Sequence, residues 1–152
     1  MQKIVTYLWF ESQAEEAVEY YTSLFPDSKV MDTTPGPDGK MMVATFQLAG
    51  QEFIALNGGP QFKFNEAISL LVRCRDQAEV DRLWNRLVAD GGEEGNCGWL
   101  KDKFGLSWQI IPTRLGELIG DPDRERAGRA IQAMLGMHKI DIAGLERAAA
   151  GA

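Results

Sequence analysis

Two short segments of the chain are apolar, and a run with helical periodicity follows each of them. Residues 4–10 (IVTYLWF) and 68–74 (ISLLVRC) are rich in β-branched or aromatic side chains, which is typical of strands. Apolar residues then recur at helical spacing from Ala14 to Phe25 and again from Val80 to Val88. Each half of the chain therefore begins with a predicted strand and an amphipathic helix.

The two predicted helices begin with nearly the same tetrapeptide, SQAE at residues 12–15 and DQAE at 76–79, an offset of 64 positions. Ser12 and Asp76 have side chains that accept hydrogen bonds from the amides of a first helical turn. Glu15 and Glu79, three positions later, can reach back to the amide of the cap residue. The repeat thus predicts two capping boxes and gives these carboxylates a structural role.

The segments after each helix also correspond. SKVMDTT, MMVATFQL and QEFIALN predict three strands, separated by turns at Pro35–Gly39 and at Ala49-Gly50. The second half continues with shorter strands, in which residues 105–111 match 50–56 at an offset of 55. The predicted fold is α+β, with two tandem βαβββ modules at residues 1–60 and 66–113 that together form one domain. With a helix on one face of each sheet, the opposite faces can line a shared cavity.

Residues 114–152 have a different pattern, rich in Ala, Arg and Glu. Ala130, Ile131, Met134 and Leu135 form one apolar stripe, and Ile140, Ile142 and Leu145 form a second set. This pattern predicts a C-terminal extension of two helices with a break near residues 136–139. Such an extension can pack on the sheet edge, cap the cavity or join a partner chain.

Composition narrows the classes of partner. Of 152 residues, 45% are hydrophobic and 25% charged, and the net charge of −6 disfavours nucleic acid or an anionic membrane. We expect no transmembrane helix, because no apolar run approaches 18 residues, and the N-terminal residues lack the features of a signal peptide. Two cysteines are too few for a disulfide framework, so we expect a cytoplasmic protein.

Strand alternation indicates which side chains face the cavity. If Leu8 and Phe10 face the helix, like Val72 and Cys74 in the second half, their neighbours face the cavity. The predicted ligand-binding residues are then polar or aromatic: Tyr7, Trp9, Ser69, Arg73, Cys97, Trp99 and Gln109. Such a set is typical of a small-molecule site, although these side chains can also simply fill the space between the sheets.

Two of these residues have alternative roles. Arg73 facing inward would indicate an anionic ligand, but at a strand end it can also reach solvent. Cys97 lies two residues before Trp99 and is predicted on the same strand face, as a thiol nucleophile if a cation lowers its pKa or as a small packed residue. Cys74 is expected in the core.

The duplicated unit resembles the vicinal oxygen chelate superfamily, which includes glyoxalase I, extradiol dioxygenases and the bleomycin and fosfomycin resistance proteins. The similar stretches include YLWFESQAEEAVEYYTSLFPDSKV, FQLAGQEFIALNGG, CGWLKDKFGLSWQIIPT and the tail MHKIDIAGLERA. Within the superfamily the chain resembles the group named after 3-demethylubiquinone-9 3-methyltransferase. The resemblance implies a glyoxalase-like cavity and a homodimer.

The methyltransferase name does not match the residues. Binding of S-adenosylmethionine usually requires a glycine-rich loop that follows a strand and opens a helix. NGGP at residues 57–60 has no Gly-x-Gly spacing, and ADGGEEG at 89–95 closes a helix. We therefore expect no such cofactor.

The resemblance also implies four places where metal-dependent relatives carry His or Glu. In this chain they fall at Val5, at Ser69, at Gln109 and at Ile54, or at Asn57 if the strand is shifted. Val and Ile cannot bind a metal, and neutral Ser and Gln are poor ligands. Asn57 joins the predicted ligand-binding residues, and no metal is expected. The single histidine, His138, lies in the tail and is expected at a helix end or in solvent.

These observations predict a cytoplasmic protein that binds a small organic molecule. It is either an enzyme that works without a metal or a non-catalytic sequestering protein of the resistance type. Methyl transfer is the third alternative.

Overall fold

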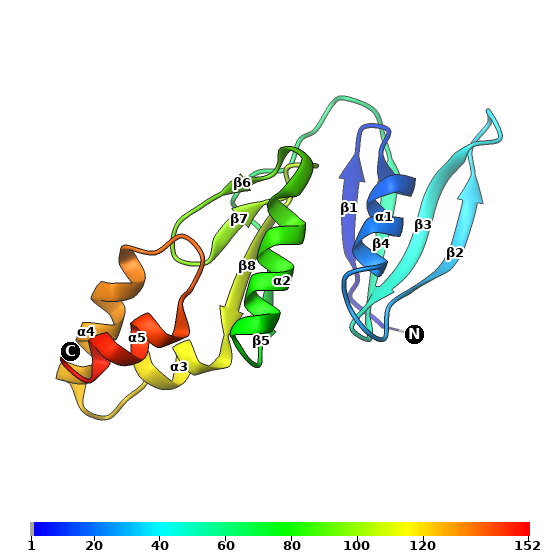
Figure 1. The fold of residues 1–152 in the computed structure, drawn as a ribbon. Coiled ribbons are helices and arrows are strands. Elements are labelled where there is room, and N and C mark those ends of the chain that lie inside the picture. The colour runs from blue at the N-terminus through cyan, green and yellow to red at the C-terminus, as the bar shows by residue number, and fades with distance from the viewer. Residues whose placement is uncertain (1) are drawn as a thin grey trace. The chain divides into compact units, whose positions relative to one another are not determined.

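The computed structural model describes residues 2–152, which form two compact units that meet in sequence at Phe64 and Asn65. Each unit contains one four-stranded mixed sheet with a helix on one face (Figure 1). The predicted α+β fold with two βαβββ modules is confirmed. The pairing of both modules into a single domain stays a prediction.

The first module has the strand order β1-β4-β3-β2, in which β1 and β4 are parallel and the other pairs antiparallel. The parallel pair requires a long crossover, and α1 lies within it. The elements are β1 (Thr6–Phe10), α1 (Ala14–Thr22), β2 (Lys29–Pro35), β3 (Met41–Leu48) and β4 (Gln51–Asn57).

The second module repeats this topology with the order β5-β8-β7-β6 and a parallel β5–β8 pair. Its antiparallel strands are shorter, as the smaller offset at the last strand predicted. The elements are β5 (Ser69–Cys74), α2 (Gln77–Val88), the 3-10 turn η1 (Ala89–Gly91), β6 (Glu93–Glu94), β7 (Trp99–Lys101) and β8 (Ser107–Pro112).

The register of the parallel pairs confirms both sequence offsets. Tyr7 pairs with Ile54 in the first module, and Leu71 pairs with Gln109 in the second. These partners differ by 64 positions on the first strand and by 55 on the last. The two sheets are therefore equivalent residue by residue at their centre.

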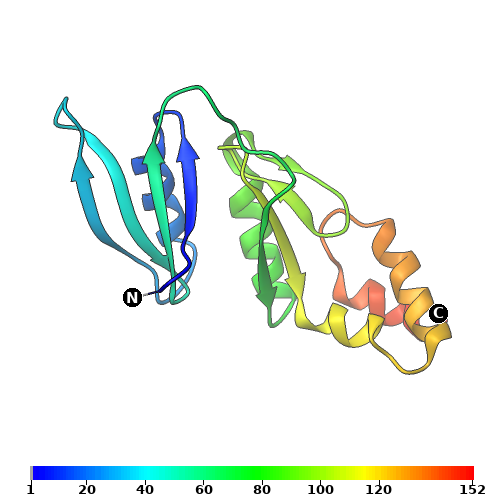
Figure 2. The same cartoon turned by 180° about the vertical axis from the view of Figure 1, so that it is seen from behind.

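Burial alternates along the strands as predicted. Leu8 and Phe10 are buried beneath α1, and Trp108 and Ile110 are buried beneath α2. Figure 2 shows each module from the side that its helix leaves uncovered. We call these uncovered sides the open face of the first sheet and the open face of the second sheet.

Only one of the two predicted capping boxes forms. At α2, the Asp76 side chain accepts a hydrogen bond from Glu79 N at 2.9 Å. Glu79 Oε1 accepts a hydrogen bond from Arg75 N at 2.8 Å, whereas the sequence predicted the amide of Asp76 as the donor. At α1 the prediction is wrong: the helix begins at Ala14, and its amide donates to Asn57 Oδ1 at 2.8 Å. A side chain at the end of β4 thus replaces Ser12 as the cap.

The C-terminal extension contains three helices, whereas the sequence predicted two. They are α3 (Thr113–Ile119), α4 (Arg124–Leu135) and α5 (Ile142–Ala149), and the predicted break lies between α4 and α5. Their shared core consists of Leu115, Leu118, Ala130, Ile140, Leu145 and Ala149. Leu135, expected on the apolar stripe, is exposed.

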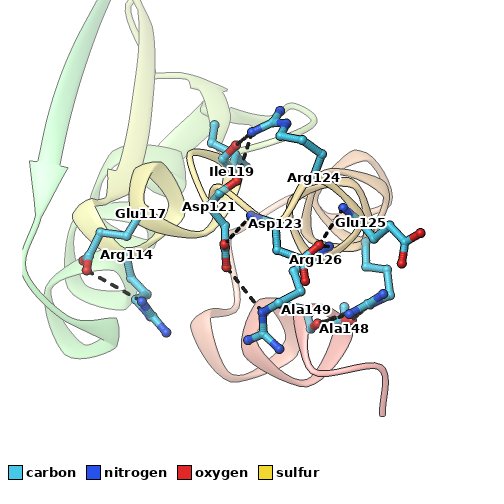
Figure 3. Close-up of polar contacts among 11 residues, drawn as sticks. Arg114, Glu117, Ile119, Asp121, Asp123, Arg124, Glu125, Arg126, Ala148 and Ala149 are labelled. Carbon is cyan, nitrogen blue, oxygen red and sulfur yellow. Dashed lines mark hydrogen bonds and ion pairs between the residues drawn. The ribbon is translucent and has the colours of Figure 1, made fainter.

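Polar contacts shape the segment between α3 and α4 (Figure 3). Arg124 donates to the carbonyls of Ile119 and Asp121, and the Asp121 carboxylate pairs with Arg126 at 3.3 Å. A backbone hydrogen bond from Asp123 and the Arg126 guanidinium hold the pKa of Asp121 below its ordinary value. These contacts define the turn that ends α3, which the sequence pattern did not indicate.

The extension is fastened to the second module. Gln77, in the first turn of α2, donates to Ile140 O at 3.0 Å and accepts from Ile142 N at 2.8 Å. The amides of Cys97 and Gly98 donate to Met137 O and His138 O, each at 2.8 Å. Within residues 2–152, no helix is long and apolar enough to cross a membrane.

Candidate functional site

The open face of the second sheet brings together four of the predicted ligand-binding residues. Trp99 of β7 pairs with Gln109 of β8, which pairs with Leu71 of β5. Ser69 and Arg73 lie two positions on either side of Leu71 and share its face. The strand parity deduced from the sequence therefore holds across this sheet, while a ligand-binding role for these residues stays a prediction.

Gln109 and Ser69 form a hydrogen bond on this face. Gln109 Nε2 donates to Ser69 Oγ at 2.9 Å, and both residues are half-buried. The amide keeps a carbonyl oxygen as an acceptor, and the hydroxyl keeps its hydrogen as a donor. The pair can thus offer both kinds of hydrogen bond to a neutral or anionic group.

The open face of the first sheet is more apolar. Tyr7 is 54% exposed, and Trp9 is half-buried. Trp9 Nε1 donates to Gly59 O at 2.9 Å, and the Phe62 ring lies edge-on to the indole with the centroids 4.9 Å apart. The backbone at Gly58 packs directly against the indole, because a Cβ there would lie 2.4 Å from Trp9 Cε2. The segment after β4 therefore holds Trp9 in place.

Asn57 does not lie on the open face. It pairs with Phe10, whose side chain is buried on the helix side, so the expected cavity position is wrong. Its amide caps α1, and its Nδ2 donates to Met41 O at 3.1 Å. The equivalent of Gln109 in the first sheet is Ile54, as the unshifted alignment predicted.

Cys97 also departs from its expected place. It precedes β7 in a turn and has φ +58°, so it does not share a strand face with Trp99. Cys74 is buried as predicted, and burial raises the pKa of its thiol to about 12. The only histidine, His138, is exposed, and its Nδ1 lies 2.8 Å from Gly95 O, where it must donate.

The donor set at the superfamily's metal positions does not fit a divalent ion. The four positions hold Val5, Ile54, Ser69 and Gln109, and the Ser69 oxygen already accepts from Gln109. Nowhere in residues 2–152 do three or more His, Cys, Asp or Glu side chains cluster so that they can hold a metal.

Sequence reasoning missed a polar cluster at one end of the same sheet. Lys101 forms an ion pair with Glu66, and its partner on the neighbouring strand β8 is the buried Ser107. The ammonium of Lys101 lowers the pKa of Glu66, and the carboxylate of Glu66 raises the pKa of Lys101. Alternation on β7 and β8 could have placed Lys101 and Ser107 together, since both lie two residues from predicted site positions.

A second missed residue is Asp102, which is 2% exposed. Its Oδ1 accepts from the amides of Phe104 and Leu106 at 2.9 and 3.1 Å, and its Oδ2 accepts from Trp108 Nε1 at 2.9 Å. Gly105, with φ +88°, completes the turn. The carboxylate thus joins β7 to β8 and fixes Trp108 beneath the sheet that presents Gln109.

Comparison with known proteins assigns the chain to a family. Residues 2–111 match the family model 3-demethylubiquinone-9 3-methyltransferase. The chain belongs to this family and has the glyoxalase-like fold. None of the curated proteins matches it.

Solved structures agree with this assignment. A PhnB protein from Bacillus cereus, described as a 3-demethylubiquinone-9 3-methyltransferase, is 36% identical with TM-score 0.68, covering 73% of this chain and 99% of that one. A protein from Pseudomonas aeruginosa is 22% identical with TM-score 0.59, over 74% and 98% of the two chains. The fosfomycin resistance protein FosX from Listeria monocytogenes, complexed with Mn(II) and sulfate, is 16% identical with TM-score 0.51, over 71% and 90%.

Proposed function

We propose that this protein binds a small organic molecule on the open face of the second sheet, without a bound metal. The observation that supports this proposal is the Gln109–Ser69 hydrogen bond beside Trp99. It orients one donor and one acceptor next to an aromatic wall, which is the usual make-up of a small-molecule site. Arg73, on the same face, is a further candidate for contact with the ligand.

Gln109 and Ser69 can bind and orient a ligand through neutral hydrogen-bonding groups. Gln109 occupies the position of a metal-binding Glu in relatives, and an amide neither holds a divalent ion alone nor acts as a base near neutral pH. Cys97, the other candidate for chemistry, lies in a turn. These features favour a binding protein over an enzyme, and turnover of the bound molecule is one outcome of the test.

The test is retention of a ligand by the purified protein. We would incubate it with metabolite pools, S-adenosylmethionine and divalent ions, and identify retained species by native mass spectrometry. Gln109→Ala and Ser69→Ala should lose the retained molecule. Gln51→Ala, which alters an exposed glutamine of the first module, should keep it.

The outcomes separate the alternatives. A retained molecule that is released chemically changed would indicate a metal-free enzyme. Retained S-adenosylmethionine would indicate methyl transfer, and a stoichiometric metal would contradict the donor-set argument. Equal retention by the protein and by Gln109→Ala would refute the proposed site.

We also propose that the protein is a cytoplasmic homodimer. Every residue of the edge strand β2 is exposed, including Val30 and Met31, and such an edge favours association. Both cysteines are free, which suits a reducing compartment. Sedimentation that gives only a 16.9 kDa species at micromolar concentration would contradict the dimer.

A further inference from the structure

A small cavity lies at the end of the second sheet where β6 pairs with β7. Its volume is about 110 Å³, and it is lined by Glu66, Glu93, Glu94, Gly95, Trp99, Leu100, Lys101 and Ser107. Because a water molecule occupies about 30 Å³ in the liquid, the cavity has room for a group of about three or four heavy atoms. It borders the Gln109–Ser69 pair, since Ser69 and Ser107 are partners on neighbouring strands.

Ser107 is an unsatisfied polar group in the wall of this cavity. The residue is 1% exposed, and its Oγ has no hydrogen-bond partner among residues 2–152. It pairs with Lys101 on one side and Ser69 on the other, so its side chain belongs to the open face. Buried hydroxyls are normally hydrogen-bonded, and an exception indicates a missing partner.

The charges around the cavity favour a cationic partner. Glu93 pairs with Lys101 on the neighbouring strand, so its carboxylate shares the open face with the Glu66 carboxylate and the Lys101 ammonium, which leaves one negative charge. The hydrogen bond to Glu66 and its negative charge raise the pKa of Lys101. The net negative charge would therefore repel an anion. Lys101, the cation that could pair with an anion here, already pairs with Glu66.

The indole ring of Trp99 also favours a cation in this cavity. Trp99 lines the cavity, and indole rings attract cations through the negative potential of their faces. Glu94 faces the other way, because its strand partner Leu100 is buried and its Oε1 accepts a hydrogen bond from Trp84 Nε1 of α2 at 2.9 Å. The carboxylates are not clustered closely enough to hold a metal ion within residues 2–152. A cation that brings its own N–H donors fits these groups better than a bare ion.

We propose that this cavity binds a protonated primary amine, whose N–H group donates to Ser107 Oγ while Glu93 supplies the counter-charge. The cavity accommodates the ammonium group and about two carbons. This inference rests on the proposed function, because it names the chemical class of one end of a molecule that continues toward Gln109. The ligand is then an amine with a polar or anionic remainder.

The experiment uses ethylammonium as the probe, with acetate and ethanol as controls of similar size. Binding to the full chain is followed by NMR at the Trp99 indole N–H and the Ser107 amide. Ethylammonium should produce saturable shifts, and neither acetate nor ethanol should. Ser107→Ala and Glu93→Gln should each weaken binding by about tenfold or more. Glu125→Gln, an exposed change on α4, should leave it unaltered.

A readout on the free protein separates a ligand-binding role for Ser107 from a structural role. Ser107→Ala removes an unsatisfied hydroxyl, so it should leave the free protein as stable or make it more stable. Destabilisation by Ser107→Ala would mean that the hydroxyl has a structural partner, and this would overturn the proposal. Binding of acetate, equal binding of ethylammonium by Ser107→Ala, or no binding of the amine would also overturn it.

Failure of this inference is distinguishable from failure of the proposed function. If retention of a molecule from the metabolite pools depends on Gln109 but not on Ser107, the amine site is refuted and the proposed function is supported. Ethylammonium binding that depends on Ser107, with nothing retained through Gln109, would do the reverse.

Discussion

Asp102→Asn tests the idea that one buried carboxylate holds the β7–β8 turn. Three N–H groups converge on its two oxygens, at 2.9, 3.1 and 2.9 Å. Asparagine has nearly the same shape but only one acceptor oxygen. In the least costly arrangement this oxygen keeps the amides of Phe104 and Leu106, and the new NH₂ group then faces the Trp108 indole N–H.

The magnitude follows from these contacts. Loss of the indole bond to a charged acceptor costs about 1.5–3 kcal/mol, and the two remaining bonds weaken because their acceptor is now neutral. Burying an amide is less costly than burying a carboxylate, which offsets part of this loss. We expect a destabilisation of about 3 kcal/mol, which corresponds to a fall in melting temperature of about 6–12 °C for a chain of this size.

The assay is urea unfolding followed by tryptophan fluorescence and far-UV circular dichroism. The matched control is Asp38→Asn, because the Asp38 carboxylate accepts from one backbone amide, that of Lys40 at 2.9 Å, in an exposed turn. The control should change the free energy of unfolding by less than about 1 kcal/mol. If Asp102→Asn is as mild as Asp38→Asn, the carboxylate does not hold the turn and the reasoning is wrong.

Three further predictions concern single residues. Asn57→Ala should destabilise the protein by about 1 kcal/mol through loss of the α1 cap, whereas Ser12→Ala should be neutral, as measured by urea unfolding. Gly58→Ala should displace the indole that lies 2.4 Å from the new Cβ and change the tryptophan fluorescence spectrum; an unchanged spectrum would contradict the close approach. Because burial raises the pKa of the Cys74 thiol to about 12, the unfolded chain loses this proton first as pH rises above about 9, so native stability falls from there toward pH 12. Cys74→Ala should lose less stability than the parent between pH 8 and pH 10, as measured by urea unfolding at each pH.

The parts of the fold that depend on local alternation could be predicted from the sequence. Periodicity placed the strands and both module helices, and it assigned Leu8, Phe10 and Cys74 to the helix side correctly. The repeat offsets gave the register, because the equivalence of Ile54 and Gln109 needs only a count along two similar modules. Alternation also identified the open face that contains Ser69 and Trp99.

The errors arose where a distant or backbone-dependent contact overrode the local pattern. Ser12 has a suitable side chain for a cap, but Asn57 reaches the same amide from 43 positions away. Cys97 was assigned to a strand because its spacing from Trp99 fits one, yet its positive φ ends the alternation. The extra helix α3 begins directly after β8, with no capping side chain to announce it.

The two modules differ in how they satisfy the first turn of their helices, and this difference has a consequence for the order of folding. The cap of α2 comes from Asp76 and Glu79 within the same tetrapeptide, so this helix can nucleate before any sheet exists. The cap of α1 becomes available only when β4 has reached β1, which requires closure of a loop of more than 40 residues. Protection of the Ala14 amide from hydrogen exchange therefore reports the closing of the first module, whereas protection of the Glu79 amide reports helix formation alone. A duplicated unit has in this way acquired one half that starts locally and one half that must assemble as a whole.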